Sequence, residues 1–207
     1  YVLIEARYSH GRVYACEPNP LSYKLLKANV RINGLEDKVT LYNVALGNRN
    51  QNIDFIANKR ANLSRVDQNA SGNIKVKMTT VDDLFKDAQI SCIRMDVEGY
   101  ELRILQGARK ILESVSGLFI EVHPQLMKNY GDTIRDFYEF LSRYDFKIAY
   151  IVKPIVYDNP PLKKVLPRQI RIRNYVEVET EIIHQPITNV YEKLLSYGGV
   201  YHIFLER

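Results

Sequence analysis

The feature that most constrains the fold is a regular alternation of strand-like and helix-like segments over most of the chain. Short apolar runs, such as 90–97 and 117–122, are separated by segments whose apolar residues recur at helical spacing. This alternation is typical of βαβ units and a largely parallel sheet. We therefore predict an α/β, doubly wound fold. Strands are expected at 13–17, 39–46, 52–57, 73–79, 90–97, 117–122, 146–152 and 200–206, and helices at 1–8, 21–32, 81–85, 101–114 and 133–144.

Acidic residues stand at the ends of three of these predicted strands. They are Glu17, Asp96 with Glu98 close behind, and Glu121 with His123 close behind. Ligands of open parallel sheets bind beyond the carboxyl ends of the strands, so these side chains are expected to converge on one site. Clustered carboxylates favour a cationic ligand.

Five segments resemble the FkbM-type S-adenosylmethionine-dependent methyltransferases. The resemblance covers about residues 10–150, and it is weaker in the final strand. Its most specific part is "DVEGYE" followed by "LQGA". It implies a single methyltransferase domain over 1–207, with a seven-stranded, mostly parallel, Rossmann-like sheet of the class I type and a reversed strand near one edge. In order, the segments are "GRVYACEPNPLSYKLLKANVRINGL", "VTLYNVALGN", "TTVDDL", "IRMDVEGYELRILQGARKIL" and "LFIEVHP".

The resemblance also implies a binding site for S-adenosyl-L-methionine. Glu17, with Pro18 beside it, is expected to take the ribose hydroxyls, and Asp96 to lie beside the methionine portion and the methyl group. The expected adenine wall is formed by Asn43, Val44 and Ala45.

The implied reaction is O-methylation of a sugar hydroxyl or of another small or glycan acceptor. The catalytic candidates are Asp96, His123 and Glu98, because a nucleophilic hydroxyl needs a base within hydrogen-bond reach. Glu121 and His123 are expected at the acceptor. His123 has an alternative interpretation as a structural histidine before a proline, and Glu98 and Glu101 as acids that complement a helix dipole. No metal is expected, because the acids lack a diagnostic spacing.

One departure from the family pattern concerns the N-terminus. Class I methyltransferases carry a glycine-rich loop after their first strand, whereas "YVLIEARYSHGRV" matches the helix that follows it. We therefore expect the N-terminal strand and the glycine loop to be missing from this sequence. The alternative of another class is a non-catalytic binding or scaffold protein that retains the fold.

A basic, proline-rich insertion is predicted at about 153–190, before the last strand. Its cations Lys163, Lys164, Arg168, Arg171 and Arg173 and the net charge of +5 allow an RNA or phosphate partner. The segment "VYACEPNPLSYKLLKANVRINGL" also resembles part of some tRNA-modifying enzymes, so an RNA (tRNA) methyltransferase is a further alternative. The residues Met95–Gly99 count against it, because such enzymes usually carry an Asn-Pro-Pro type motif there.

The remaining features concern the compartment. Two cysteines inside apolar runs, the lack of a secretory pattern and the lack of a long apolar run predict a cytoplasmic protein with free thiols and no membrane span. The sequence does not specify the acceptor or the oligomeric state.

Overall fold

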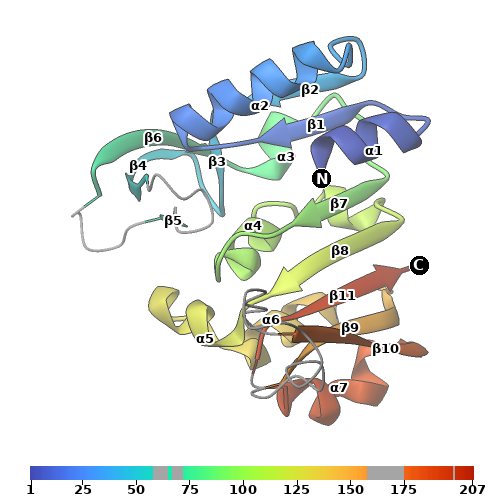
Figure 1. The fold of residues 1–207 in the computed structure, drawn as a ribbon. Helices are drawn as coiled ribbons and strands as arrows, with labels where there is room; N and C mark the ends of the chain where they lie inside the picture. The colour runs from blue at the N-terminus through green and yellow to red at the C-terminus, as the bar shows by residue number, and fades with distance from the viewer. Residues whose placement is uncertain (58–64, 67–71, 158–174, 198) are drawn as a thin grey trace, which may run out of the picture. The chain divides into compact units, whose positions relative to one another are not determined.

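The computed structural model describes residues 1–57, 65–66, 72–157, 175–197 and 199–207 (Figure 1). The chain divides into two compact units, which are described separately. The first unit comprises residues 1–90 and 102–113, and the second comprises residues 91–101 and 114–207.

The first unit begins with a parallel pair of strands joined by a helix. β1 (Val13–Cys16) pairs in parallel with β2 (Val39–Tyr42), and α2 (Pro20–Ile32) connects them. The helix begins where the Asn19 side chain accepts a hydrogen bond from the Leu21 amide, which is a standard N-terminal cap. A short α1 (Val2–Tyr8) precedes these strands in the same unit, and its buried Ala6 packs in the same core as Val30.

The predicted strand over 39–46 is two strands that belong to different sheets. β3 (Ala45–Leu46) leaves β2 and pairs in parallel with β6 (Ile74–Thr79), which is antiparallel to β4 (Gln51–Ile56). The prediction of one continuous strand over 39–46 was therefore wrong, whereas strands are found at the two places predicted as 52–57 and 73–79, and they pair antiparallel. This sheet also contains β5 (Arg65–Val66), and α3 (Val81–Leu84) follows it.

The second unit is built on a five-stranded sheet in the order β10-β9-β11-β8-β7. β7 and β8 are parallel, with Met95 opposite Ile120. β11 is antiparallel to both β8 and β9, so it is a reversed strand between parallel neighbours. The strand bounds are β7 (Cys92–Met95), β8 (Gly117–Val122), β9 (Lys147–Tyr157), β10 (Tyr175–Pro186) and β11 (Tyr201–Glu206).

The core of the second unit follows the period of its strands. In β11, every second residue is buried, namely Tyr201, Ile203 and Leu205. α6 (Ile134–Leu141) begins with a capping box formed by Thr133 and Asp136. The other helical segments are α5 (Pro124–Met127), η3 (Lys128–Tyr130) and α7 (Ile187–Leu195).

The helix predicted over 101–114 is shorter than expected. α4 (Glu101–Gln106) ends before Gly107, and a separate 3-10 turn, η2, spans Ile111–Glu113. The Asp82 carboxylate accepts hydrogen bonds from the amides of Lys110 and Ile111. Those amides are thereby bonded outside the helix, which explains its early end.

The predicted insertion at about 153–190 is partly regular structure. β9 continues to Tyr157 and pairs with β10, and α7 begins at Ile187. Within this stretch, the two strands extend one antiparallel ladder. The basic residues Lys163, Lys164, Arg168, Arg171 and Arg173 lie outside the described residues.

Two broader expectations meet different outcomes. A mixed α/β protein with a reversed strand is found, but β1 and β2 form a sheet separate from the five strands of the second unit, so a single seven-stranded sheet stays a prediction. Among the residues that the structure describes, no helix combines the length and the apolar character that a bilayer crossing requires.

Candidate active site

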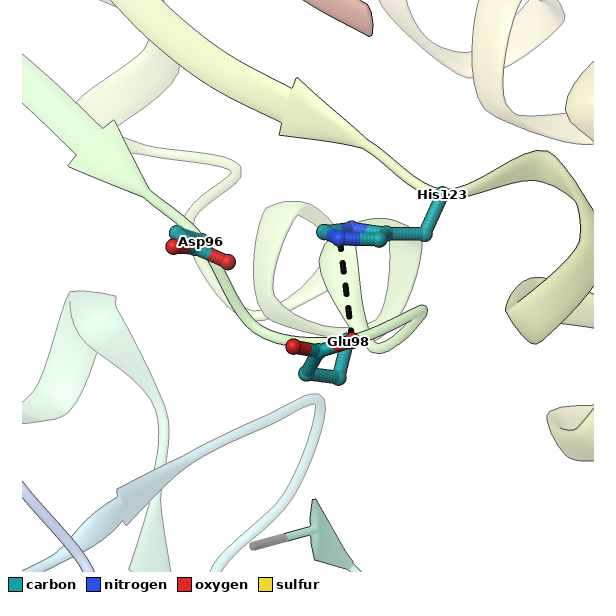
Figure 2. Close-up of side chains that lie close together, drawn as sticks. All are labelled: Asp96, Glu98 and His123. Carbon is teal, nitrogen blue, oxygen red and sulfur yellow. Dashed lines mark ion pairs between the residues drawn. The ribbon is translucent and has the colours of Figure 1, made fainter. Parts of the chain in front are cut away.

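The site lies at the carboxyl ends of two parallel strands of the second unit, β7 and β8. Asp96 follows β7 directly, and His123 follows β8 directly (Figure 2). Glu121 is the next to last residue of β8, one position beyond the pair formed by Met95 and Ile120. The register therefore brings Asp96 and Glu121 to one level, where the charge of Asp96 acts on the Glu121 carboxyl.

His123 is held by a buried carboxylate, that of Glu101, whose place in the sequence indicates only a helix start. Its Nδ1 lies 2.7 Å from Oε1 of Glu101, the first residue of α4. The imidazole is 4% exposed and Glu101 is fully buried. The amide of Gly99 donates a second hydrogen bond to the same carboxylate oxygen, at 3.1 Å. Glu101 thus fixes the ring so that Nδ1 faces Glu101 and Nε2 faces the other acids.

A tight turn carries the third side chain of the site. Glu98 has a φ of 52° and Gly99 a φ of 96°, a backbone region that glycine adopts easily and other residues rarely. The turn directs Glu98 towards His123, and its Oε2 lies 3.7 Å from Nε2 of the ring. A Cβ at Gly99 would lie 2.5 Å from the carbonyl carbon of Leu126, so the position has no room for a side chain. The backbone therefore turns sharply at Gly99.

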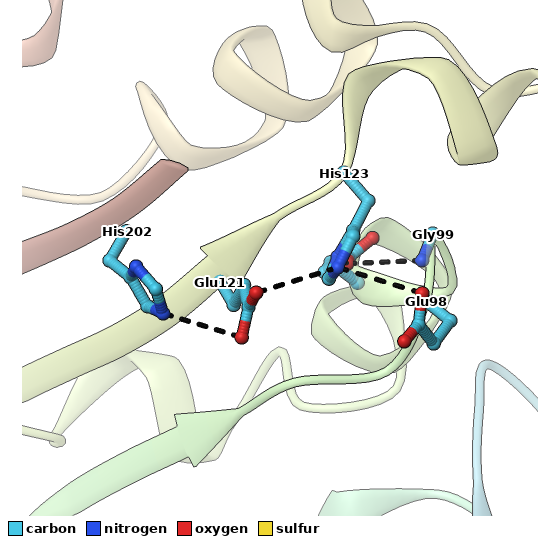
Figure 3. A network of polar contacts seen from close by, with 6 residues as sticks. Glu98, Gly99, Glu121, His123 and His202 are labelled. Atoms are coloured by element: carbon cyan, nitrogen blue, oxygen red, sulfur yellow. Dashed lines mark hydrogen bonds and ion pairs between the residues drawn. The ribbon is translucent and has the colours of Figure 1, made fainter. Parts of the chain in front are cut away.

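Glu121 connects His123 to a second histidine that sequence analysis did not identify. Its Oε1 lies 3.8 Å from Nε2 of His123, and its Oε2 lies 3.3 Å from Nε2 of His202 (Figure 3). His202 is on β11, directly opposite Glu121 in the antiparallel ladder. The pairing of β11 with β8 brings these residues together. No local sequence motif predicts this pairing.

The electrostatics of the site are dominated by carboxylates. Burial raises the pKa of Glu98, and the charges of Asp96 and Glu101 add to the effect while His123 opposes it. Burial also raises the pKa of Glu121, and Asp96 adds to it. Burial acts to lower the pKa of His123, but the Glu101 hydrogen bond and the neighbouring negative charges outweigh it and raise this pKa. The arrangement therefore stabilises a proton on the imidazole, which suits a group that accepts one.

Three side chains of the site have the donor atoms and the spacing to bind a metal ion. One ligand atom each from Asp96, Glu98 and His123 lie within 4.8 Å of one another (Figure 2). Asp96 is exposed, Glu98 half-buried and His123 buried. The cluster thus combines an imidazole nitrogen and two carboxylates at the surface of the second unit.

The residues expected to bind the cofactor, apart from Asp96, lie in the first unit. Oε1 of Glu17, just after β1, accepts a hydrogen bond from the Asn19 amide at 2.8 Å. Burial raises the pKa of Glu17. The side-chain amide of Asn43 donates hydrogen bonds to the backbone oxygens of Glu17 and Pro18, at 2.7 and 3.2 Å. These bonds join the segments that follow β1 and β2.

The expected adenine wall has a mixed exposure. Asn43 is exposed and Val44 half-buried, but Ala45 is 4% exposed because it belongs to β3. Its methyl group packs in the core. The predicted contact between Ala45 and adenine is therefore not supported by the exposure of this side chain, which is almost fully buried.

The fold and the site define an α/β protein whose chemistry-bearing side chains stand beyond the carboxyl ends of parallel strands, as in many nucleotide-dependent enzymes. The model of the family described as "Methyltransferase FkbM domain" matches residues 2–148. The chain belongs to this family of methyltransferases.

Two known proteins are similar to the chain over part of its length. It is 26% identical over 116 residues to "Hexuronic acid methyltransferase AglP" of Haloferax volcanii, a match that covers 55% of this chain and 48% of that protein. The chain thus spans about half the length of the curated relative that it matches. The crystal structure of a methyltransferase FkbM from Methylobacillus flagellatus KT matches with a TM-score of 0.45 and 20% identity, over 67% of this chain and 32% of the other.

Proposed function

We propose that this chain belongs to an enzyme that transfers a methyl group from S-adenosylmethionine to a hydroxyl oxygen of a sugar acceptor, with a hexuronic acid as the first acceptor to test. Membership of the FkbM methyltransferase family supports the methyl transfer, and the printed name of the Haloferax relative supports the acceptor class. The site geometry of the second unit supports an oxygen nucleophile.

The first unit offers a carboxylate that fits the ribose of the donor. Oε1 of Glu17 is bonded to the Asn19 amide. Among the described residues no hydrogen bond engages the other oxygen, which leaves it available to a ribose hydroxyl. Glu17 would hold the ribose, Pro18 would pack beside it, and Asn43, Val44 and Ala45 would adjoin the base. S-adenosylmethionine supplies a methyl group that is bound to a sulfonium. When the methyl group is transferred, the rest of the donor leaves as a neutral thioether.

The second unit offers the groups that act on the acceptor. An acceptor hydroxyl that gains a methyl group must lose its proton to a base within hydrogen-bond reach. Asp96, Glu98 and His123 supply the basic atoms, and Glu121 with His123 would bind the sugar. Nε2 of His123 is the basic atom whose orientation is best defined.

One observation carries the acceptor side of the proposal, namely the contact between His123 and Glu101. A buried carboxylate that binds one ring nitrogen fixes the tautomer and the direction of the other, as in hydrolytic triads. A histidine with a structural role alone does not need its second nitrogen directed at two strand-end carboxylates.

The proposal is tested with the full-length protein and a tritium-labelled methyl donor. Donor binding is measured first by calorimetry. Label is then followed into a hexuronic acid oligosaccharide, a neutral oligosaccharide and bulk tRNA. The expected product is an alkali-stable ether on a sugar. Alkali-labile label would indicate methylation of the carboxylate and overturn the hydroxyl assignment. Label in tRNA would favour the RNA alternative, and absence of donor binding would favour the scaffold alternative.

A matched pair of variants assigns the site. His123→Gln should reduce transfer by about 10²-fold or more, the range in which general bases contribute. His184→Gln is the control, because His184 also pairs with a carboxylate, Glu206, at 2.9 Å in the same unit. Equal transfer by the two variants would contradict the assignment of His123.

A further inference from the structure

The cluster at the ends of β7 and β8 has the composition of a metal centre. Asp96, Glu98 and His123 provide two oxygen donors and one nitrogen donor, all within 4.8 Å of one another. Two ligands of one ion, each at about 2.1 Å from it, lie at most about 4.2 Å apart, so small side-chain rotations close the site. Exposed acidic clusters without any ion are common, and this one differs from them in a second respect.

The second observation is the state of the imidazole. His123 is 4% exposed, and its Nδ1 is bonded to the buried Glu101. Its Nε2 faces Glu98 and Glu121 at 3.7 and 3.8 Å, which is beyond hydrogen-bond distance. A buried ring nitrogen thus points at carboxylates without a hydrogen bond among the described residues.

The Glu101 contact is itself typical of a metal-binding histidine. Such histidines almost always donate their other ring N–H to a carboxylate or a carbonyl, which fixes the tautomer and raises the basicity of the ligating nitrogen. Glu101 is fully buried at the start of α4, and the Gly99 amide holds the same oxygen. The structure therefore contains both the three ligands and the group that orients one of them.

The charge of the surroundings also favours a cation. In the described part of the chain, the ion pairs of Glu98, Glu101 and Glu121 all involve the two histidines, His123 and His202. Four carboxylates, with Asp96 included, meet there. A divalent ion would offset this charge.

We propose that Asp96, Glu98 and His123 bind one divalent first-row transition-metal ion, with Glu101 as the positioning residue of His123. The mixed donor set decides the class of ion. Imidazole suits ions such as Fe²⁺ and Zn²⁺, and carboxylates suit Mn²⁺ and Mg²⁺, so Mn²⁺ to Zn²⁺ match both donors better than Mg²⁺ does. Three protein ligands leave coordination positions open.

The role of the ion rests on the proposed function. A hexuronic acid is an anion, and an acidic cluster alone would repel it, whereas an ion with open positions can bind its oxygens. A bound hydroxyl loses its proton more easily. An ion on Nε2 of His123 would occupy the lone pair of that nitrogen, so the role of base would pass from His123 to the carboxylate of Glu121, which would take the proton. The new bond would form between the hydroxyl oxygen and the methyl carbon, and the sulfur would keep the electron pair of the broken bond.

Metal binding is tested separately from methyl transfer. The full-length protein is stripped with a chelator and titrated with Mn²⁺ under electron paramagnetic resonance, since bound Mn²⁺ loses the six-line signal of the free ion. Zn²⁺ and Mg²⁺ are tested by competition. We expect one Mn²⁺ per chain, displaced by Zn²⁺ and poorly by Mg²⁺. No bound Mn²⁺ or Zn²⁺, or Mg²⁺ bound more tightly than Mn²⁺, would overturn the proposal.

Variants locate the ion. Asp96→Asn and Glu98→Gln should each weaken Mn²⁺ binding by at least about 10-fold, and Glu101→Gln by roughly 10- to 100-fold, as for other groups that orient a ligand. Glu206→Gln is the matched control, because Glu206 also pairs with a histidine in this unit and should leave the affinity unchanged. Circular dichroism spectra establish that each variant is folded.

The outcomes separate the two proposals. If the ligand variants bind Mn²⁺ as tightly as the parent protein, the ion lies elsewhere and the metal proposal fails. If binding follows the pattern above but no methyl transfer occurs, the metal site stands and the proposed function fails. Transfer that is unaffected by the chelator would remove the ion from the reaction.

Discussion

Replacement of Gly99 by alanine isolates what the turn between β7 and α4 contributes to the second unit. The φ of 96° is unfavourable for alanine, and the new Cβ would lie 2.5 Å from the backbone of Leu126. The backbone conformation costs about 1–2 kcal/mol for a residue with a side chain. The steric conflict adds about 1–3 kcal/mol, as in overpacked cores. The free energy of unfolding should therefore fall by about 2–5 kcal/mol, measured by urea denaturation followed by far-ultraviolet circular dichroism.

The control is Gly131→Ala in the same unit. Gly131 has a φ of 74°, but nothing lies within 4 Å of a Cβ placed there. This variant should lose only the backbone cost of about 1–2 kcal/mol. The difference between the two variants measures the contact with Leu126. Equal losses would refute the steric argument, and the turn at Gly99 would then be explained by its backbone conformation alone.

Three further predictions concern the donor site, the core and the acceptor site. Glu17→Ala should weaken binding of S-adenosylmethionine by about 1–3 kcal/mol in calorimetry, the cost of hydrogen bonds to a charged group; unchanged affinity would remove Glu17 from the site. Tyr201→Phe should lower the free energy of unfolding by about 1–3 kcal/mol, because the fully buried Tyr138 hydroxyl loses its partner at 2.7 Å. Adding Tyr138→Phe should recover part of that loss in urea denaturation, and a further loss would contradict the pairing. Asp96→Asn should lower the turnover number in a methyl-transfer assay and leave the urea midpoint of unfolding nearly unchanged, because Asp96 is exposed. A variant that loses stability and activity together would indicate a structural role.

The parts of the fold that the sequence predicts are those set by local pattern. The strand at 117–122 follows from a short apolar run and the helix at 21–32 from apolar residues at helical spacing, and both are found within a residue or two. The helix at 101–114 was overextended, because its end depends on hydrogen bonds from the distant Asp82.

The same distinction applies to the candidate site. Asp96, Glu121 and His123 follow from one rule, that parallel strands present their carboxyl ends at one edge. Glu101 was identified as an acid at a helix start, but its contact with His123 requires a turn with two positive φ angles. His202 depends on the register between β11 and β8, which long-range strand pairing decides.

The position of the reversed strand has a consequence for the order of assembly. β11 lies between β8 and β9, yet it follows every other strand of this sheet in the sequence. During synthesis, the edges of β8 and β9 that face β11 have no hydrogen-bond partner in this sheet until the six residues of β11 have been made. Unpaired edges of this kind are prone to pair with other chains. Late pairing over long sequence separation also slows folding. A nascent chain of this protein would therefore be most vulnerable to aggregation just before β11 emerges, and a chaperone that covers strand edges would be most useful at that stage.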